Sequence, residues 1–117
     1  MPNINDCLFC QIAHDPEKLV WESETVAVFK DIHPQAPVHV LLMPKKHITS
    51  LADTEEDDRD TLGDLLLAVK KVAKSLQIDE SGYRVIINTR DHGGQMVDHL
   101  HLHLLGGEVI GPLRART

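Results

Sequence analysis

Residues 99–105 read His-Leu-His-Leu-His-Leu-Leu, and this alternation constrains the fold of the chain more than any other segment. Successive side chains of a β-strand point to opposite faces of its sheet, so one face would carry His99, His101 and His103 at intervals of roughly 6.6–7 Å. The leucines between them would point the other way, into a core. The segment therefore predicts a strand with one apolar face and one face covered by imidazoles.

Three imidazoles on one face have three interpretations. They could cover a solvated sheet face, although Thr or Lys is the more usual choice there. They could bind a metal ion, because imidazole is the commonest metal ligand, or one of them could act as a nucleophile or acid–base catalyst near pH 7. The alternation favours a functional face and leaves the metal and catalytic interpretations open.

The neighbours of the histidine run favour a phosphate-bearing ligand. Gly93, Gly94 and Gln95 precede the run, and Asn88 ends the segment before it. Glycine-rich turns expose backbone N–H groups that suit an anionic phosphate. With a formal net charge of −6 over 117 residues, the chain lacks the basic surface that coating a nucleic acid requires. We therefore expect a small ligand and no nucleic acid partner.

The remaining segments predict four further strands and two helices. A short helix is expected over residues 8–13, and β-rich segments lie at residues 19–22, 25–29, 38–43 and 83–88. A long helix should start near Asp53 or Thr54, where Thr54 and Asp57 resemble a capping pair. Its apolar stripe, at steps of three and four, consists of Leu62, Leu65, Leu66, Val69, Val72, Ala73 and Leu76.

This order of elements predicts an α+β fold. We expect a five-stranded antiparallel sheet with the long helix on one face and the short helix beside it, in a single domain over residues 1–117. The chain shows no secretory signal pattern and no apolar run of the roughly 18 residues that a membrane span needs. We therefore expect a cytoplasmic protein without a membrane partner. In that compartment the pair Cys7-x-x-Cys10 indicates a metal site or a redox pair rather than a structural disulfide.

The histidine run and its flanking segments resemble the histidine triad (HIT) family, and within it the branch of histidine triad nucleotide-binding proteins. The run has that family's pattern of three histidines alternating with apolar residues. The flanking segments that resemble the branch, in the same order along most of the chain, are residues 31–39, 43–48, 82–84, 93–95 and 105–107.

The resemblance implies a purine nucleoside phosphoramidase that hydrolyses AMP phosphoramidates or related acyl-adenylates through a covalent nucleotidyl-histidine intermediate. It implies that His101 is the nucleophile and that His103 contacts the phosphate and the leaving group. His39 and Asn88 would complete the catalytic pocket, and Asp31 would bind the ribose hydroxyls. The other nucleotide-binding positions would be Phe29, Ile32, Gly94, Gln95 and Met96. Clustered imidazoles also disfavour one another's protonation, which favours a neutral His101.

Two departures from the family pattern concern the leaving group. Met96 stands where members often carry a small hydroxyl residue, so proton delivery would depend more on His103. Residues 108–113 lack the aromatic ending of some members. The resemblance also implies a homodimer that pairs through the long helix and a strand into one continuous sheet.

The resemblance assigns a second, structural site to the cysteine pair. HIT relatives with Cys-x-x-Cys at this place resemble zinc proteins, which implies a structural zinc ion held by Cys7, Cys10, His47 and His99 and not needed for catalysis. Such a site would brace the strand that carries His101. In the alternative interpretation, Cys7 and Cys10 are small buried residues of a short helix.

Other functions stay open at this point. They are a dinucleoside polyphosphate hydrolase, a metalloenzyme in which His99, His101 and His103 together bind zinc, and a nucleotide-binding interaction module with incidental hydrolysis. The histidines outside the proposed sites are expected to be ordinary surface residues: His14, His33 and His92.

Overall fold

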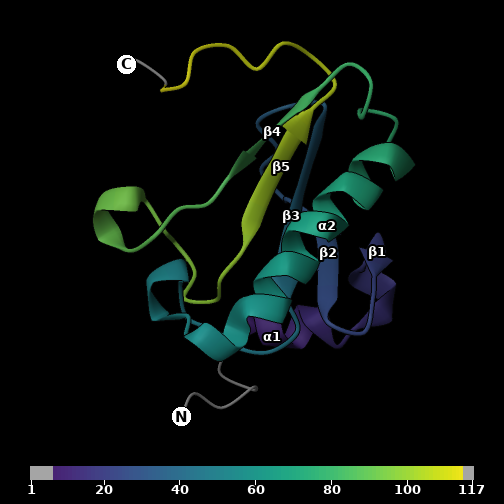
Figure 1. Cartoon of the computed structure of the whole chain (residues 1–117). Helices are drawn as coiled ribbons and strands as arrows, with labels where there is room; N and C mark the ends of the chain where they lie inside the picture. The colour runs from purple at the N-terminus through teal and green to yellow at the C-terminus, as the bar shows by residue number, and fades with distance from the viewer. Residues whose placement is uncertain (1–6, 115–117) are drawn as a thin grey trace.

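The structure, a computed structural model, describes residues 7–114. Its five strands form one antiparallel sheet of order β1-β2-β3-β5-β4, with the long helix α2 across one face (Figure 1). The helices and strands are α1 (Leu8–Ala13), β1 (Trp21–Glu22), β2 (Val26–Lys30), β3 (Val38–Pro44), α2 (Arg59–Ser75), β4 (Tyr83–Ile86) and β5 (Leu102–Gly106). The predicted α+β fold with five strands, one long helix and one short helix is confirmed.

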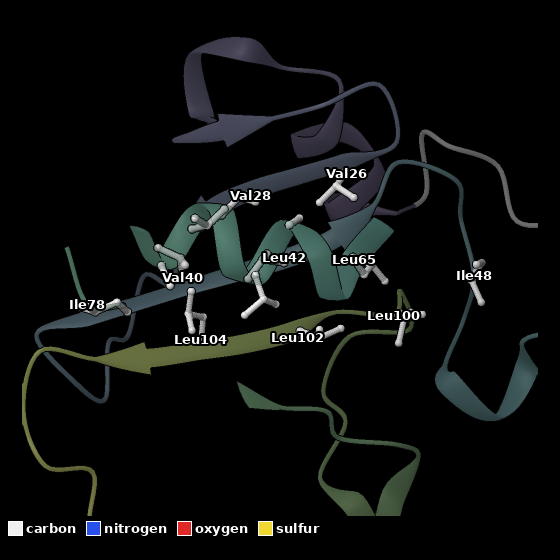
Figure 2. Packing of buried hydrophobic residues seen from close by; sticks show 14 residues of the cluster. Val26, Val28, Val40, Leu42, Ile48, Leu65, Ile78, Leu100, Leu102 and Leu104 are labelled. Atoms are coloured by element: carbon white, nitrogen blue, oxygen red, sulfur yellow. The ribbon is translucent and has the colours of Figure 1, made fainter. Parts of the chain in front are cut away.

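Alternating side chains of the central strands pack on opposite faces of the sheet. On the α2 face, residues of β2, β3 and β5 form the main core with the helix (Figure 2); they include Val26, Val28, Val40, Leu42, Leu102 and Leu104. On the other face, the intervening residues of β2 and β3 pack under α1; this second cluster consists of Phe9, Ala13, Ala27, Phe29, Leu41 and Met43. The second face of the sheet is thus partly covered by core residues, and the candidate active site lies beside them.

The histidine strand begins later than predicted. β5 pairs with β3 from Leu102 onward, opposite Leu42, so His99 and His101 precede the strand. The backbone N–H of Leu100 leaves the sheet and donates to the carbonyl of Ile48, 2.7 Å away. The predicted sorting of side chains nevertheless holds, because Leu100 joins the core under α2 together with Leu102 and Leu104 of β5.

The start of α2 also differs from the prediction. Residues 51–53 and 56–58 form separate 3-10 turns, and α2 begins only at Arg59. The Thr54 hydroxyl donates to the carbonyl of Leu51 and caps nothing further along. The buried Asp58 carboxylate instead accepts from the Glu55 backbone N–H at 2.8 Å and from the Lys46 ammonium at 2.7 Å. The predicted capping pair was therefore wrong. The hydrogen bonds of Asp58 hold the turn that precedes α2.

Two faces of the molecule remain open. Leu66, expected in the core stripe of α2, is 59% exposed, whereas the stripe residues Leu65, Val69 and Val72 are buried as predicted. β4 pairs with β5 alone in the described part of the chain, so its other edge is free, and Asn88 lies beyond its end. None of the helices in residues 7–114 has the length and apolar character needed to cross a membrane.

Candidate active site and metal centre

A pocket of about 470 Å³ opens beside the second core. The ends of four strands contribute to it, with Asp31 directly after β2, His39 on β3, Ile86 on β4 and His103 on β5. Its complete lining is Asp31, His33, Gln35, His39, Ile86, Asn88, Met96, His103 and Leu105. The size is typical of pockets that hold small molecules.

The hydrogen bond of His101 fixes which of its ring nitrogens carries the proton. Nδ1 lies 2.7 Å from the carbonyl oxygen of His99, and a carbonyl can only accept, so Nδ1–H donates. In the neutral ring the lone pair is then on Nε2. The structure gives this Nε2 no hydrogen bond. Among residues 7–114 every buried side-chain nitrogen or oxygen has a hydrogen-bond partner, so His101 Nε2 is not buried and is accessible. His101 is thereby arranged as a neutral nucleophile.

A second chain of hydrogen bonds fixes His103 in the complementary state. The backbone N–H of Gln35 donates to His39 Nδ1 over 3.0 Å, so the neutral His39 carries its proton on Nε2. That Nε2–H donates to His103 Nδ1 at 2.9 Å, with Asp31 Oδ2 3.3 Å from the same nitrogen. Because His103 Nδ1 accepts, its own proton lies on Nε2. His103 can therefore act as a proton donor.

Electrostatics disfavours a charged His103 within the imidazole cluster formed by His39, His101 and His103. The pKa of His103 falls to about 4, chiefly because of burial and further because protonated His101 and His39 would repel its charge, with Asp31 opposing the fall. The ring centroids of His101 and His103 lie 5.2 Å apart. His103 is therefore neutral near pH 7, and it lies beside the candidate nucleophile.

The four predicted zinc ligands converge on one another. His99 Nδ1 lies 3.5 Å from the sulfurs of both Cys7 and Cys10, and His47 Nδ1 lies 3.2 Å from the Cys10 sulfur. The ligand atoms all lie within 4.8 Å of one another. Tetrahedral zinc with Zn–S near 2.3 Å and Zn–N near 2.0 Å implies S···N separations of about 3.5 Å. The four residues therefore fit one ion.

The surroundings of this metal cluster support the fit. His99 Nε2–H donates to the carbonyl of Pro44 at 2.8 Å, which leaves the lone pair on Nδ1 toward the sulfurs. Burial, the hydrogen bond with Cys7 and the charge of Cys7 raise the pKa of Cys10 to about 11. Two adjacent thiolates in this buried position need a cation beside them, and a bound metal ion supplies one.

This geometry argues against one metal ion shared by the whole histidine run. His99 Nδ1 points toward the cysteines, and His101 Nδ1 donates to a carbonyl. A second convergent group, formed by Asp31, His39 and His103, would need the lone pair of His39 Nε2, yet that nitrogen carries the proton. In the described residues the triad therefore divides between the metal cluster and the pocket.

Comparison with known proteins decides the family. The sequence profile of the HIT domain matches residues 13–109.

The chain belongs to the HIT family.

Its similarity to individual members covers most of both chains. It is 42% identical to the purine nucleoside phosphoramidase of Escherichia coli K12 over 100 residues, which are 86% of this chain and 84% of that protein. It is also similar to the structure of a histidine triad protein from Clostridium difficile, with 38% identity, a TM-score of 0.89 and coverage of 97% and 100%. A HIT family hydrolase from Legionella pneumophila gives 46% identity, a TM-score of 0.82 and coverage of 87% and 93%.

The predicted catalytic and nucleotide-binding residues of this HIT chain divide into two sets. Those that line the pocket are Asp31, His39, Asn88, Met96 and His103, and His101 lies next to them. Those that do not line it are Phe29, Ile32, Gly94 and Gln95. Ile32 is 85% exposed beyond β2, whereas Phe29 is buried against Phe9 in the second core. Their predicted nucleotide contacts remain predictions.

Sequence reasoning missed four residues of the pocket lining. Leu105 shares a face of β5 with His103, two positions before it, so the period of two could have found it. Ile86, the last residue of β4, lies opposite His103 in the pairing of β4 with β5. Gln35 and His33 gave no such signal. His33, expected to be an ordinary surface residue, borders the pocket, and its backbone N–H donates to Asp31 Oδ1 at 2.8 Å.

The glycine-rich turn does not offer the free N–H groups that we expected. The N–H groups of Gly93 and Gln95 donate to the carbonyl of Arg90, and that of Gly94 donates to the carbonyl of Asp91. The turn closes on itself as a 3-10 turn at Asp91–Gly93, which uses these three donors internally. The expectation was therefore wrong for these groups.

The side chain of Gln95 organises the same loop. Its Nε2 donates to the carbonyls of Thr49 at 2.7 Å and Val97 at 3.0 Å, and its Oε1 accepts from the Arg90 backbone N–H at 2.9 Å. Every group of the amide is thus used within the protein. Gln95 acts as a structural residue beside Met96, which is the residue of this loop that reaches the pocket.

Proposed function

We propose that this HIT protein is a purine nucleoside phosphoramidase that hydrolyses AMP-type phosphoramidates through a nucleotidyl intermediate on His101. The observation that carries the proposal is the pair of complementary tautomers, with a lone pair on His101 Nε2 and a proton on His103 Nε2. The likeness to the Escherichia coli purine nucleoside phosphoramidase supports the substrate class.

In the first step, Nε2 of His101 attacks the phosphorus and the P–N bond breaks. The leaving nitrogen takes the proton from Nε2 of His103 while a proton from solvent water replaces it, so an amine departs and His103 stays neutral. The nucleotidylated His101 keeps its proton on Nδ1 and is positively charged. The carbonyl of His99, 2.7 Å from that nitrogen, stabilises this charge.

In the second step, water attacks the phosphorus. The attacking water hydrogen-bonds to the imidazole cluster and releases its proton to solvent, and the bond from phosphorus to His101 breaks. AMP is released, and both rings regain their starting tautomers. His39 keeps His103 Nδ1 as an acceptor throughout, because its own Nδ1 stays bonded to the Gln35 N–H.

Within the pocket, Asp31 is the group suited to the ribose hydroxyls. Its carboxylate belongs to the pocket lining, together with Asn88 and Met96. The His33 N–H and His39 Nε2 hold its two oxygens, which fixes the carboxylate while leaving lone pairs for substrate hydroxyls. Asn88 offers an amide to the phosphate.

Mass spectrometry of the trapped intermediate tests the proposal. Quenching wild-type protein with adenosine 5′-phosphoramidate should give an acid-labile adduct of one AMP on a peptide containing His101, and His101→Ala should give neither adduct nor turnover. The matched control is His33→Ala, which changes a histidine of the pocket lining outside both hydrogen-bond chains. Full turnover by His101→Ala would exclude the mechanism.

We also propose that the metal cluster, Cys7, Cys10, His47 and His99, holds a structural zinc ion. The four ligand atoms lie at separations suited to tetrahedral zinc, and the cluster is closed by two sulfurs and two nitrogens as in structural rather than catalytic sites. The ion would supply a fixed link between α1 and the segment that carries His101.

A homodimer is the assembly that we propose. The free edge of β4 and the exposed Leu66 of α2 support pairing with a second copy into a continuous sheet. Light scattering after gel filtration should give twice the 13.1 kDa of the chain, and Leu66→Glu should lower that mass. A single-chain mass for the wild type at micromolar concentration would contradict the dimer.

A further inference from the structure

Phe9 links the metal cluster to the candidate nucleophile. It lies on α1 between Cys7 and Cys10, and it is buried in the second core. The centroid of its ring lies 5.1 Å from that of His101, with the two planes at 78°. The same ring meets Phe29 at 5.1 Å and 78°. Phe9 thus packs against the candidate nucleophile and precedes the predicted metal ligand Cys10 in the chain.

We infer that Phe9 is a positioning residue for His101, and that the metal cluster acts on catalysis through it. The inference rests on the proposed nucleotidyl transfer to His101. Phe9 would hold the plane of the imidazole so that Nε2 faces the phosphorus, and the metal cluster would hold Phe9 at the required place.

His101 needs such a contact because one hydrogen bond does not fix the orientation of the ring plane. Its Nδ1–H is bound to the His99 carbonyl, which fixes one atom and leaves the plane of the ring free to tilt about that bond. The edge-to-face contact with Phe9 restrains the tilt, because aromatic rings prefer this geometry. Small errors in the direction of an attacking atom cost large factors in rate.

Phe9 in turn depends on the metal cluster. α1 has six residues, too few for a helix to be stable by its own hydrogen bonds. Cys7 caps its N-terminus, where the Cys10 N–H donates to the Cys7 sulfur at 3.4 Å. Both sulfurs reach His99, and Cys10 also reaches His47. An ion bound by these residues would therefore fix the turn that carries Phe9.

Substitutions of Phe9 and of a second residue packed against the same cluster test the inference. Phe9→Leu removes the ring that meets His101, whereas Leu19→Ala loosens the second core at a partly buried residue outside the site. Rapid-quench measurement with adenosine 5′-phosphoramidate gives the rate at which the His101 adduct forms. We expect Phe9→Leu to lower that rate about tenfold, Leu19→Ala to change it less than about twofold, and Phe9→Tyr to retain it.

Metal content and NMR separate this role from general loosening. Zinc per chain should stay the same in Phe9→Leu, and the ring protons of His101 should lose the ring-current shift caused by Phe9. A chelator should slow adduct formation in the wild type and shift the same protons, but slow Phe9→Leu little further, because the link is already cut. Phe9→Met, which keeps the volume without the ring, serves if Phe9→Leu does not fold.

Three outcomes would overturn the inference. They are equal losses in Phe9→Leu and Leu19→Ala, a raised KM with an unchanged rate of adduct formation in Phe9→Leu, and equal chelator effects in the wild type and Phe9→Leu. Failure of the proposed function is a separate result, because the wild-type protein itself would then form no adduct on His101.

Discussion

His39 donates its Nε2–H to Nδ1 of His103 across 2.9 Å, and this single bond decides that His103 presents a proton to the pocket. The direction of the bond follows from the other end of the His39 ring, where the Gln35 backbone N–H occupies Nδ1. A residue remote from the histidine run in sequence therefore sets the chemical state of one of its members.

Replacing His39 should slow the hydrolysis of substrates whose leaving group needs a proton more than that of substrates whose leaving group needs none. His39→Phe removes the donor to His103 Nδ1, so His103 can adopt the other tautomer and present a lone pair in place of a proton. We expect kcat on an AMP phosphoramidate to fall about 100-fold, within the range for loss of an acid–base catalyst. An acyl-adenylate, whose carboxylate leaves without a proton, should lose much less. Steady-state kinetics on both substrates, with His33→Phe as control, measures the difference; equal losses would contradict the assignment.

The sequence predicted the sorting of this site better than its chemistry. The alternation of residues 99–105 correctly separated core leucines from histidines, because burial follows the direction of side chains even where strand pairing has ended. It could not divide the histidines by role. That division depends on the acceptors beside His99 and His101, namely the carbonyls of Pro44 and His99, and on the fold that brings them there.

Two further details also depend on tertiary structure. Gln95 was predicted to contact the nucleotide, and its amide bonds to Thr49, Val97 and Arg90, which a local pattern does not reveal. Leu66 followed the helical period of the core residues, yet it is exposed at one margin of the stripe. Local periodicity thus predicts direction, while partners come from tertiary structure.

Metal content should follow the cysteines and not the nucleophile. We expect about one zinc per chain in the wild type, little in Cys10→Ser, and the wild-type amount in His101→Ala, because His101 is no ligand in the structural site. Elemental analysis of dialysed protein gives the ratio. Removing the ion should also lower Tm by more than about 10 °C, because its binding stabilises the folded chain. Zinc lost in His101→Ala would favour the shared-metal alternative.

Two glycines should respond to alanine in opposite directions. A Cβ added to Gly63, inside α2, would have no neighbouring atom within 4 Å, so Gly63→Ala should stabilise the protein by about 0.5–1 kcal/mol through helix propensity. At Gly106, at the end of β5, a Cβ would lie 2.8 Å from Cδ1 and 3.3 Å from Cβ of the buried Ile78. Gly106→Ala should therefore cost about 1–3 kcal/mol. Urea titration of both variants measures the difference, and a shift of the same sign in both would contradict this packing.

The lowered pKa of His103 should make stability depend on pH in acid. The folded protein holds this pKa near 4, while the unfolded chain has the ordinary value of 6.5. Between these values the unfolded state binds more protons, so the free energy of unfolding should decrease as the pH falls from 6.5 toward 4. The buried His99, whose pKa burial also lowers to about 4, acts in the same direction.

A substitution isolates the share of His103 in this slope. His103→Gln removes the titrating group, so the urea midpoint of the variant should fall less between pH 7 and pH 5 than that of the wild type. The exposed His92, replaced by Gln, should leave the wild-type slope intact because its ring lies outside the imidazole cluster. If the urea midpoints of wild type and His103→Gln depended equally on pH, His103 would have the same pKa in the folded and the unfolded state. The neutral proton donor beside His101 would then lose its electrostatic basis.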